Sequence, residues 1–249
     1  MGLLKFTFEN AKLKGIWHYS LPSGHTCPGA KSCLTFADRV TGKITDKQTA
    51  VDGQKFRCYA AMDEARRPNV RKPRWDNFDL LKGKTISQIV KLIVESIKET
   101  GLKRGGTLRV HIGGDYFSQV YFNAWMKAAS YFPNIVFYSY TKSVHFLVRH
   151  LNEKQLPKNF VFTCSKGGKF DDLIPHSKVK SARVFFSKAE ADSLGLDVDH
   201  TDDLAISGSD DFALVLHGSQ PAKSKAAKAL SELKKNGFAG YNKNRAVPA

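Results

Sequence analysis

Hydrophobic positions along this chain follow two alternating periods. Short apolar runs typical of buried strands occupy residues 107–112, 135–141, 159–164, 182–187 and 212–218. Apolar residues at helical spacing occupy 118–132, 144–156, 188–195 and 221–237, and an earlier amphipathic helix is predicted over 84–101. The N-terminal segment supplies one or two further strands. This alternation of strands and helices predicts an α/β fold with a parallel sheet.

Chemically capable residues follow these strands one after another. They are His18 and Ser20, His111 to Asp115, Tyr140 to Lys142, Cys164 to Lys166, Ser187 and Lys188, and His217. The carboxyl ends of the strands in a parallel barrel meet on one face, where active sites lie. We therefore expect a TIM-barrel-like (β/α) barrel, complete or incomplete. It would form one domain over 1–249, with the helix at 221–237 packed on it.

Charge and the absence of long apolar runs narrow the function classes. The 249 residues carry a net charge of +16, which favours polyanionic partners such as nucleic acid or an acidic host protein. Cations concentrate at 65–75 and 223–235, and at both places we favour a solvated face over a nucleic-acid groove. No stretch reaches the roughly 20 apolar residues of a membrane span, and no signal peptide is visible. We expect a cytoplasmic protein without a membrane partner.

Four cysteines are the strongest chemical signal. Cys27 and Cys33 lie in a loop that contains proline and glycine, Cys58 opens a predicted helix, and Cys164 closes a strand. Cytoplasmic cysteines rarely form disulfides, and thiolates that converge require a cation. The chain has no Cys-x2-Cys zinc knuckle, and an iron-sulfur cluster tolerates wider spacing. We expect all four thiols to bind an iron-sulfur cluster, with zinc as the alternative metal.

Several motifs together resemble the bacteriophage gene product 88 family. The resemblance covers roughly residues 15–220 and rests on CPGAKSC (27–33), CYAA (58–61), RRPNVRKPRWDNFDLL (66–81), HIGGDYFS (111–118), NAWMKAA (123–129) and FYSYTKS (137–143). Residues 34–57 stand between the two cysteine elements as a loop insertion, whose TGKITDKQ (41–48) reads as a surface hairpin.

This resemblance implies a phage protein made in the cytoplasm of an infected bacterium. It also implies a barrel similar to the radical S-adenosylmethionine enzymes, with a 4Fe-4S cluster at its mouth. Gly113-Gly114-Asp115 resembles the Gly-Gly-Glu turn with which those enzymes hold S-adenosylmethionine. If Cys164 were a fourth ligand, every iron would be saturated, and S-adenosylmethionine would not be a cofactor.

Three further residues are candidates for catalysis at the barrel mouth. His111 is expected there as an acid, a base or a satisfied buried histidine. Asp115 would orient a substrate or cap a helix, and Lys142 would neutralise the cluster or an anionic substrate. Arg109, on the same strand face as His111, should require an acidic partner because a lone buried charge is costly.

The sequence leaves three functions open, and with them the question of whether the protein is an enzyme. The first is a redox or metal-dependent enzyme with an unknown small-molecule substrate. The second is a basic nucleic-acid-binding or host-interaction protein with a structural zinc or cluster. The third is a cysteine-nucleophile enzyme with His18 or His25 beside Cys27, which would leave three cysteines without a role.

Overall fold

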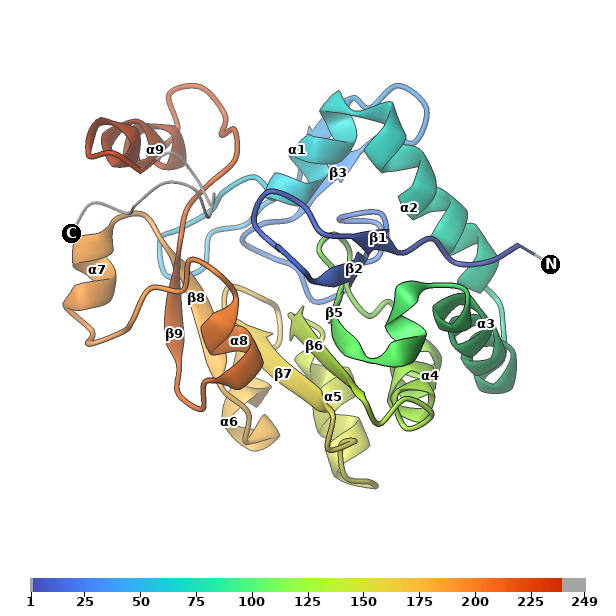
Figure 1. The fold of residues 1–249 in the computed structure, drawn as a ribbon. Helices are drawn as coiled ribbons and strands as arrows, with labels where there is room; N and C mark the ends of the chain where they lie inside the picture. Colours follow the sequence, from blue (N-terminus) through green and yellow to red (C-terminus); the bar gives the residue numbers. More distant parts are fainter. Residues whose placement is uncertain (1, 239–249) are drawn as a thin grey trace.

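A seven-stranded sheet organises the computed structural model, which describes residues 2–238 (Figure 1). Its strand order is β1-β2-β5-β6-β7-β8-β9, and all neighbours are parallel except β1 and β2. The strands are β1 (Thr7–Phe8), β2 (Trp17–Tyr19), β5 (Gly106–Val110), β6 (Ile135–Thr141), β7 (Phe160–Ser165), β8 (Ser181–Phe185) and β9 (Phe212–Val215). The predicted α/β class and mostly parallel sheet are therefore confirmed.

The sheet does not close into a TIM barrel within the described residues. Strands β1 and β9 are its two edges, and no pairing joins them. A closed (β/α) barrel uses eight parallel strands. This sheet has six mutually parallel strands, and the seventh, β1, is a two-residue strand that runs antiparallel to β2. Residues 2–238 thus supply too few parallel strands to complete a ring of eight.

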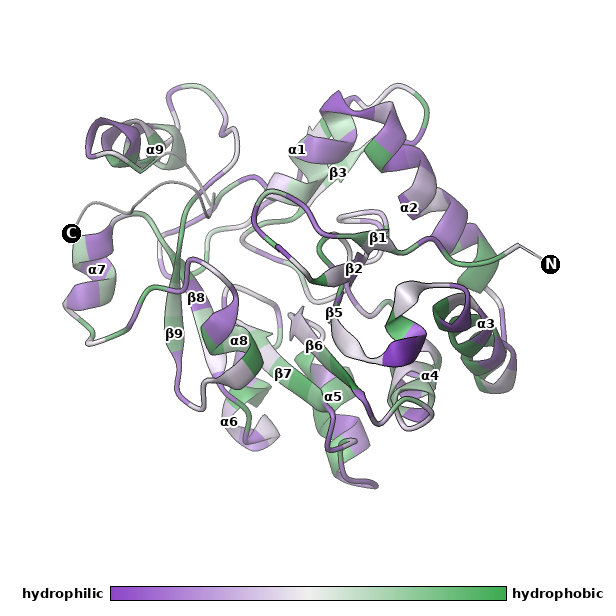
Figure 2. Cartoon of the chain, in the orientation of Figure 1, coloured by the Kyte–Doolittle hydropathy of each residue, from purple (hydrophilic) through white to green (hydrophobic). Residues whose placement is uncertain are grey.

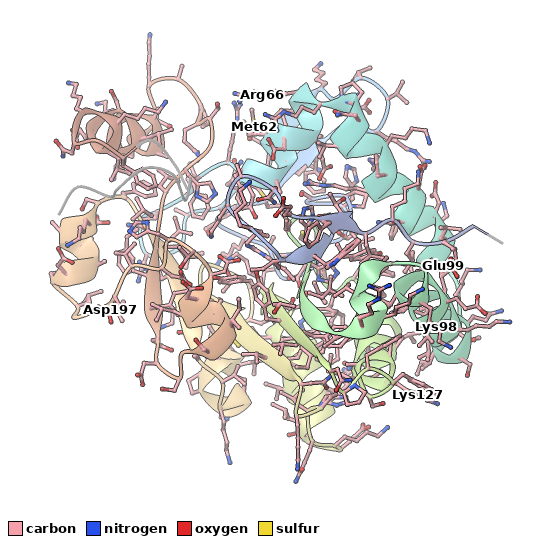
Figure 3. All side chains as sticks on the ribbon, in the orientation of Figure 1. Met62, Arg66, Lys98, Glu99, Lys127 and Asp197 are labelled. Atoms are coloured by element: carbon pink, nitrogen blue, oxygen red, sulfur yellow. The ribbon has the colours of Figure 1, made fainter. Side chains whose placement is uncertain are left out.

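Three helices pack side by side against one face of the sheet. They are α3 (Ile86–Lys98), α4 (Gln119–Ala129) and α5 (Val144–Leu151), and α3 begins with a capping box between Thr85 and Gln88. Their inward residues form the largest hydrophobic core together with those of β5, β6 and β7. Figure 2 shows the hydrophobic colour along β7 and parts of α3 and α5. Charged Lys98, Glu99 and Lys127 lie at the outer surface of α3 and α4 (Figure 3).

Most of the remaining elements cover the opposite face and the carboxyl ends of the strands, but α6 (Ile174–Ser177) and two 3-10 turns pack beside the helices of the first face. The insertion after Cys33 contains a small hairpin of β3 (Thr35–Ala37) and β4 (Ile44–Asp46). The helices that follow the hairpin and those of the C-terminal half are α1 (Tyr59–Arg66), α2 (Pro68–Leu81), α6 (Ile174–Ser177), α7 (Lys188–Asp192), α8 (Asp203–Ser207) and α9 (Lys225–Lys235), with 3-10 turns at Gly101–Arg104 and Asp171–Leu173. In α9, Ala226 and Leu233 pack with Val215 and Leu216 near β9. No helix in the described part of the chain is both long enough and apolar enough to cross a membrane.

Residues 20–33, called here the cysteine loop, lie across the carboxyl ends of β5, β6 and β7. Backbone hydrogen bonds fasten the loop at several points: Leu21 N donates to Gly113 O at 2.9 Å, and Ser32 N donates to Gly167 O at 2.9 Å. In the reverse direction, Lys169 N donates to Gly29 O at 2.8 Å. The loop is therefore held by main-chain contacts, which do not depend on its own side chains.

Glycines make this close approach of two backbones possible. A Cβ added to Gly29 would lie 2.0 Å from the carbonyl oxygen of Lys142, which is far inside any real contact. Gly114 has a φ of +80°, and a Cβ there would lie 2.6 Å from Thr26 Oγ1 and 2.7 Å from Leu21. Any side chain at either position would lift the cysteine loop from the strand ends.

We expect Gly29→Ala to destabilise the fold by about 1–3 kcal/mol, because the added methyl group overpacks a backbone contact that cannot move alone. Urea denaturation measures this change in the free energy of unfolding. Gly101→Ala is the matched control, since a Cβ there would meet only Trp17 at an ordinary 3.4 Å. Equal unfolding midpoints for the two variants would contradict the proposed docking of the loop.

Candidate functional site

A cavity of about 160 Å³ lies where the cysteine loop meets the strand ends. Cys27 and Cys33 of the cysteine loop and Cys58, the residue before α1, all line it. Asp115 and Lys142 line it as well. The structure thus brings three of the four cysteines, and all three residues predicted for catalysis, to one place at the carboxyl edge of the sheet, because His111 lines the cavity too.

Backbone amides face two of the three sulfur atoms. Gly24 N donates to Cys27 Sγ at 3.3 Å. Cys58 stands at the N-cap of α1, and the first amides of that helix, from Ala60 and Ala61, favour the ionised form of its sulfur. Amides directed at sulfur stabilise the negative charge of a thiolate.

Cys164 lies on the other side of the sheet. Successive side chains of a strand point to opposite faces, and Cys164 shares its face with Phe160 and Phe162 in the core beneath the helices. Its Sγ is 3.5 Å from Ser177 Oγ, whereas the next residue, Ser165, lines the cavity. The expectation that four thiols converge is therefore not met. Cys164 precedes Ser165 by one residue, so its side chain points to the face of the sheet opposite to the cavity.

Burial keeps the three cavity thiols protonated when no metal is bound. Desolvation raises the pKa of all three, in Cys58 to about 12, and the nearby Lys142 charge opposes the increase at Cys33. In the described residues, no three His, Cys, Asp or Glu side chains lie close enough together to hold a single metal ion. The three thiols nevertheless lie near one another, because charge on Cys58 or Cys33 raises the pKa of Cys27.

His111 contributes to the cavity wall, but its imidazole ring is enclosed by tyrosines. Its ring centroid lies 4.7 Å from that of Tyr116, 5.7 Å from Tyr121 and 6.0 Å from Tyr19, and Nε2 is 2.9 Å from Tyr121 Oη. The backbone of His111 has a φ of +69°, which breaks the strand alternation that would direct the ring toward the cavity. Desolvation lowers its pKa to about 3, so the ring is neutral.

Asp115 holds the turn between β6 and α5. Its carboxylate accepts hydrogen bonds from Thr141 Oγ1 at 2.7 Å, Lys142 N at 2.9 Å and Ser143 N at 3.2 Å. Ser118 instead caps α4, the helix that follows Asp115 in the chain. Asp115 is therefore a positioning residue for Lys142 and does not cap α4, and because it lines the cavity its role in orienting a substrate stays a prediction.

Lys142 is a buried cation bound only to neutral oxygens among the described residues. Its Nζ donates to Ser165 O at 3.0 Å and to Ser165 Oγ at 2.9 Å, and it also contacts Lys166 O. The residue is 9% exposed, and its charge acts on the Cys33 thiol. A buried cation that contacts no carboxylate favours negative charge beside it, whereas the Asp115 carboxylate in the same cavity acts in the opposite sense on Cys27 and Cys33.

An internal ion pair that the sequence analysis missed braces α1 against the cysteine loop. Arg74 Nη1 donates to Glu64 Oε1 at 2.6 Å, and the same oxygen accepts from Ser23 N at 2.9 Å. Both charged side chains are buried. The sequence feature that could have indicated this ion pair is the basic run at 65–75, in which Arg71 and Arg74 are buried. Arg66 of the same run is exposed and bonds Ser219 (Figure 3).

We expect the metal-free protein to react slowly with iodoacetamide at Cys58. Because its pKa is raised to about 12, the thiolate fraction, and with it the alkylation rate, should rise about tenfold per pH unit between about pH 7 and pH 10. Peptide mass spectrometry measures the rate at each pH. A plateau reached by about pH 8 would indicate an activated nucleophile and would contradict this prediction.

Comparisons with known proteins agree with the resemblance seen in the sequence. A family model described as Gene product 88 matches residues 3–233. The Gene 88 protein of Mycobacterium phage D29 is 31% identical over 90 residues, covering 34% of this chain and 38% of that protein. The Gene 88 protein of Mycobacterium phage L5 is 29% identical over 90 residues, with 34% and 38% covered.

These alignments span well under half the length of either curated relative. No solved structure matches the chain. Because the family model covers nearly all of the described residues, the chain belongs to the Gene product 88 family of bacteriophage proteins.

Proposed function

We propose that this protein binds an iron-sulfur cluster through Cys27, Cys33 and Cys58. The observation that carries the proposal is the convergence of three thiols, from two segments separated by an insertion, on one cavity that also contains the buried Lys142. Three thiolates in one cavity would repel one another without a cation. Burial of Lys142 without a carboxylate partner is consistent with an anionic occupant.

The residues present fit a cluster better than a single zinc ion. The chain has no Cys-x2-Cys pair of the kind typical of zinc sites, and a cluster several ångströms across tolerates the wider spacing of Cys27, Cys33 and Cys58. The amide of Gly24 at Cys27 and the helix start at Cys58 supply the N–H contacts that stabilise sulfur ligands. Lys142 would offset part of the negative charge of a 4Fe-4S cluster.

Three protein ligands would leave one position of a 4Fe-4S cluster open. Such a cluster supplies electron transfer or Lewis-acid chemistry to a ligand bound at that position. Our expectation that S-adenosylmethionine is not a cofactor depended on Cys164 as a fourth ligand, and Cys164 faces the helices instead. The proposed likeness to radical S-adenosylmethionine enzymes is thus compatible with three ligands, and the protein would be a redox or metal-dependent enzyme.

The proposed setting is the cytoplasm of an infected bacterial host. All four cysteines are free thiols, and a reducing compartment keeps thiols available for metal binding. The alternative of a nucleic-acid-binding or host-interaction protein draws on the net charge of +16. The basic run of 65–75 supports this alternative less than its charge suggests, because Arg71 and Arg74 donate to oxygens inside the protein.

The proposal is tested on full-length protein purified and reconstituted without oxygen. We expect the visible absorption of an iron-sulfur cluster, with about four iron and four sulfide per chain. Replacement of Cys27, Cys33 or Cys58 by serine should remove most of the iron. Cys164→Ser is the matched control, because it changes a cysteine on the opposite face and should retain the cluster.

Two results would overturn the proposal. Colourless protein with stoichiometric zinc would replace the cluster by a structural metal. Loss of iron in Cys164→Ser, together with a normal circular dichroism spectrum, would place the fourth thiol among the ligands and remove the open position.

A further inference from the structure

A second cavity, of about 350 Å³, adjoins the cysteine cavity. The two share part of their walls, including Tyr59, Arg109 and Tyr140. The outer wall of the second cavity comes from residues 10–13, from Asp63 of α1 and from Arg67, which follows that helix. Its floor is the face of the sheet opposite to α3, α4 and α5.

Arg109 stands at the junction of the two cavities with one side of its guanidinium group unused. Its Nη1 donates to Asp202 Oδ2 at 2.6 Å. Its Nε is fully buried without a partner, and Nη2 forms no hydrogen bond to any described residue. The side chain is 10% exposed. Nε and Nη2 form the side of a guanidinium that binds two oxygens of one anion.

Asp202 does not fully neutralise Arg109, because the same carboxylate also pairs with Lys12. Lys12 Nζ contacts Asp202 Oδ1 at 2.5 Å, and Tyr138 Oη donates to Oδ2 at 3.0 Å. Burial opposes ionisation of this carboxyl, but Arg109 and Lys12 lower its pKa to about 2. Asp202 thus pairs with two cations, and the charge of Asp199 also acts on Lys12. The nearby Asp199 is occupied by the amides of Thr201, Asp202 and Ala205 at the start of α8.

An unpartnered guanidinium edge in a buried position is costly unless something binds it. We propose that Arg109 binds the carboxylate or phosphate group of a small molecule held in the second cavity. Two parallel N–H donors match two oxygens of either group. The inference goes beyond the proposed function, because this oxyanion site is complete without a cluster.

Aromatic rings line the cavity around the proposed oxyanion. The Arg109 guanidinium lies 4.8 Å from the centroid of the Tyr140 ring, and the rings of Tyr59 and His217 are 4.5 Å apart at 37°. Desolvation lowers the pKa of His217 to about 4, so this ring is neutral. Such walls suit a planar or apolar body attached to the anionic group.

Isothermal titration of the full chain with benzoate and with phenyl phosphate tests the site. At least one probe should bind saturably to wild type, and the tighter one identifies the preferred oxyanion. Arg109→Lys keeps a cation for Asp202 but loses the two-donor edge, so it should weaken binding roughly tenfold or more. Arg149→Lys is the matched control, because Arg149 is an exposed arginine of α5 on the other face of the sheet and lines neither cavity.

Equal affinity of wild type and Arg109→Lys, or no binding of either probe at millimolar concentration, would overturn the inference. A crystal structure of wild type with the bound probe provides a second test that does not depend on the variant folding. It should show two oxygens at hydrogen-bond distance from Nε and Nη2. The same titration on Cys58→Ser separates this inference from the proposed function, since the oxyanion site should survive loss of the cluster.

Discussion

The close contact between the cysteine loop and the glycine turns at the strand ends is the constraint on which the site depends. Gly29 lies directly against the carbonyl of Lys142, and Gly167 lies against the Ser32 side chain while its carbonyl accepts from Ser32 N. Contacts between two backbones leave little room for adjustment, because neither partner can rotate away as a side chain does. The positions of Cys27 and Cys33 are therefore set by the sheet, even though both residues belong to a loop.

Buried positive charge is the second organising feature, and three buried cations have three different kinds of partner. Arg74 is neutralised by Glu64, Arg109 shares Asp202 with Lys12, and Lys142 is held by neutral oxygens. Only the first of these arrangements gives a cation a carboxylate of its own. Lys142 and Arg109 thus each offer positive charge to an occupant of their cavity, while the thiols of the first cavity stay uncharged at neutral pH when no metal is bound.

Sequence periodicity predicted the parallel strands and most helices because burial dictates their pattern. It missed α2, where Pro73 and several cations conceal a helix that turns Arg71 and Arg74 inward. The direction in which individual side chains point was harder to predict. Cys164 ends a strand as expected, but a shift of one residue changes the face. His111 is turned from the cavity by a positive φ, a backbone feature that no hydrophobic pattern encodes.

The first turn of α1 links the two cavities. Cys58 lines the cysteine cavity, and the next residue, Tyr59, lines both cavities and donates from Oη to Ile112 O at 2.9 Å. The orientation of this helix is fixed by the buried pair of Glu64 and Arg74, which also holds Ser23. Any change that tilts α1 must therefore move a thiol and a cavity wall together. The ion pair of Glu64 and Arg74 thus helps to hold Cys58, a proposed cluster ligand, and Tyr59, a wall of the proposed oxyanion site, in fixed positions.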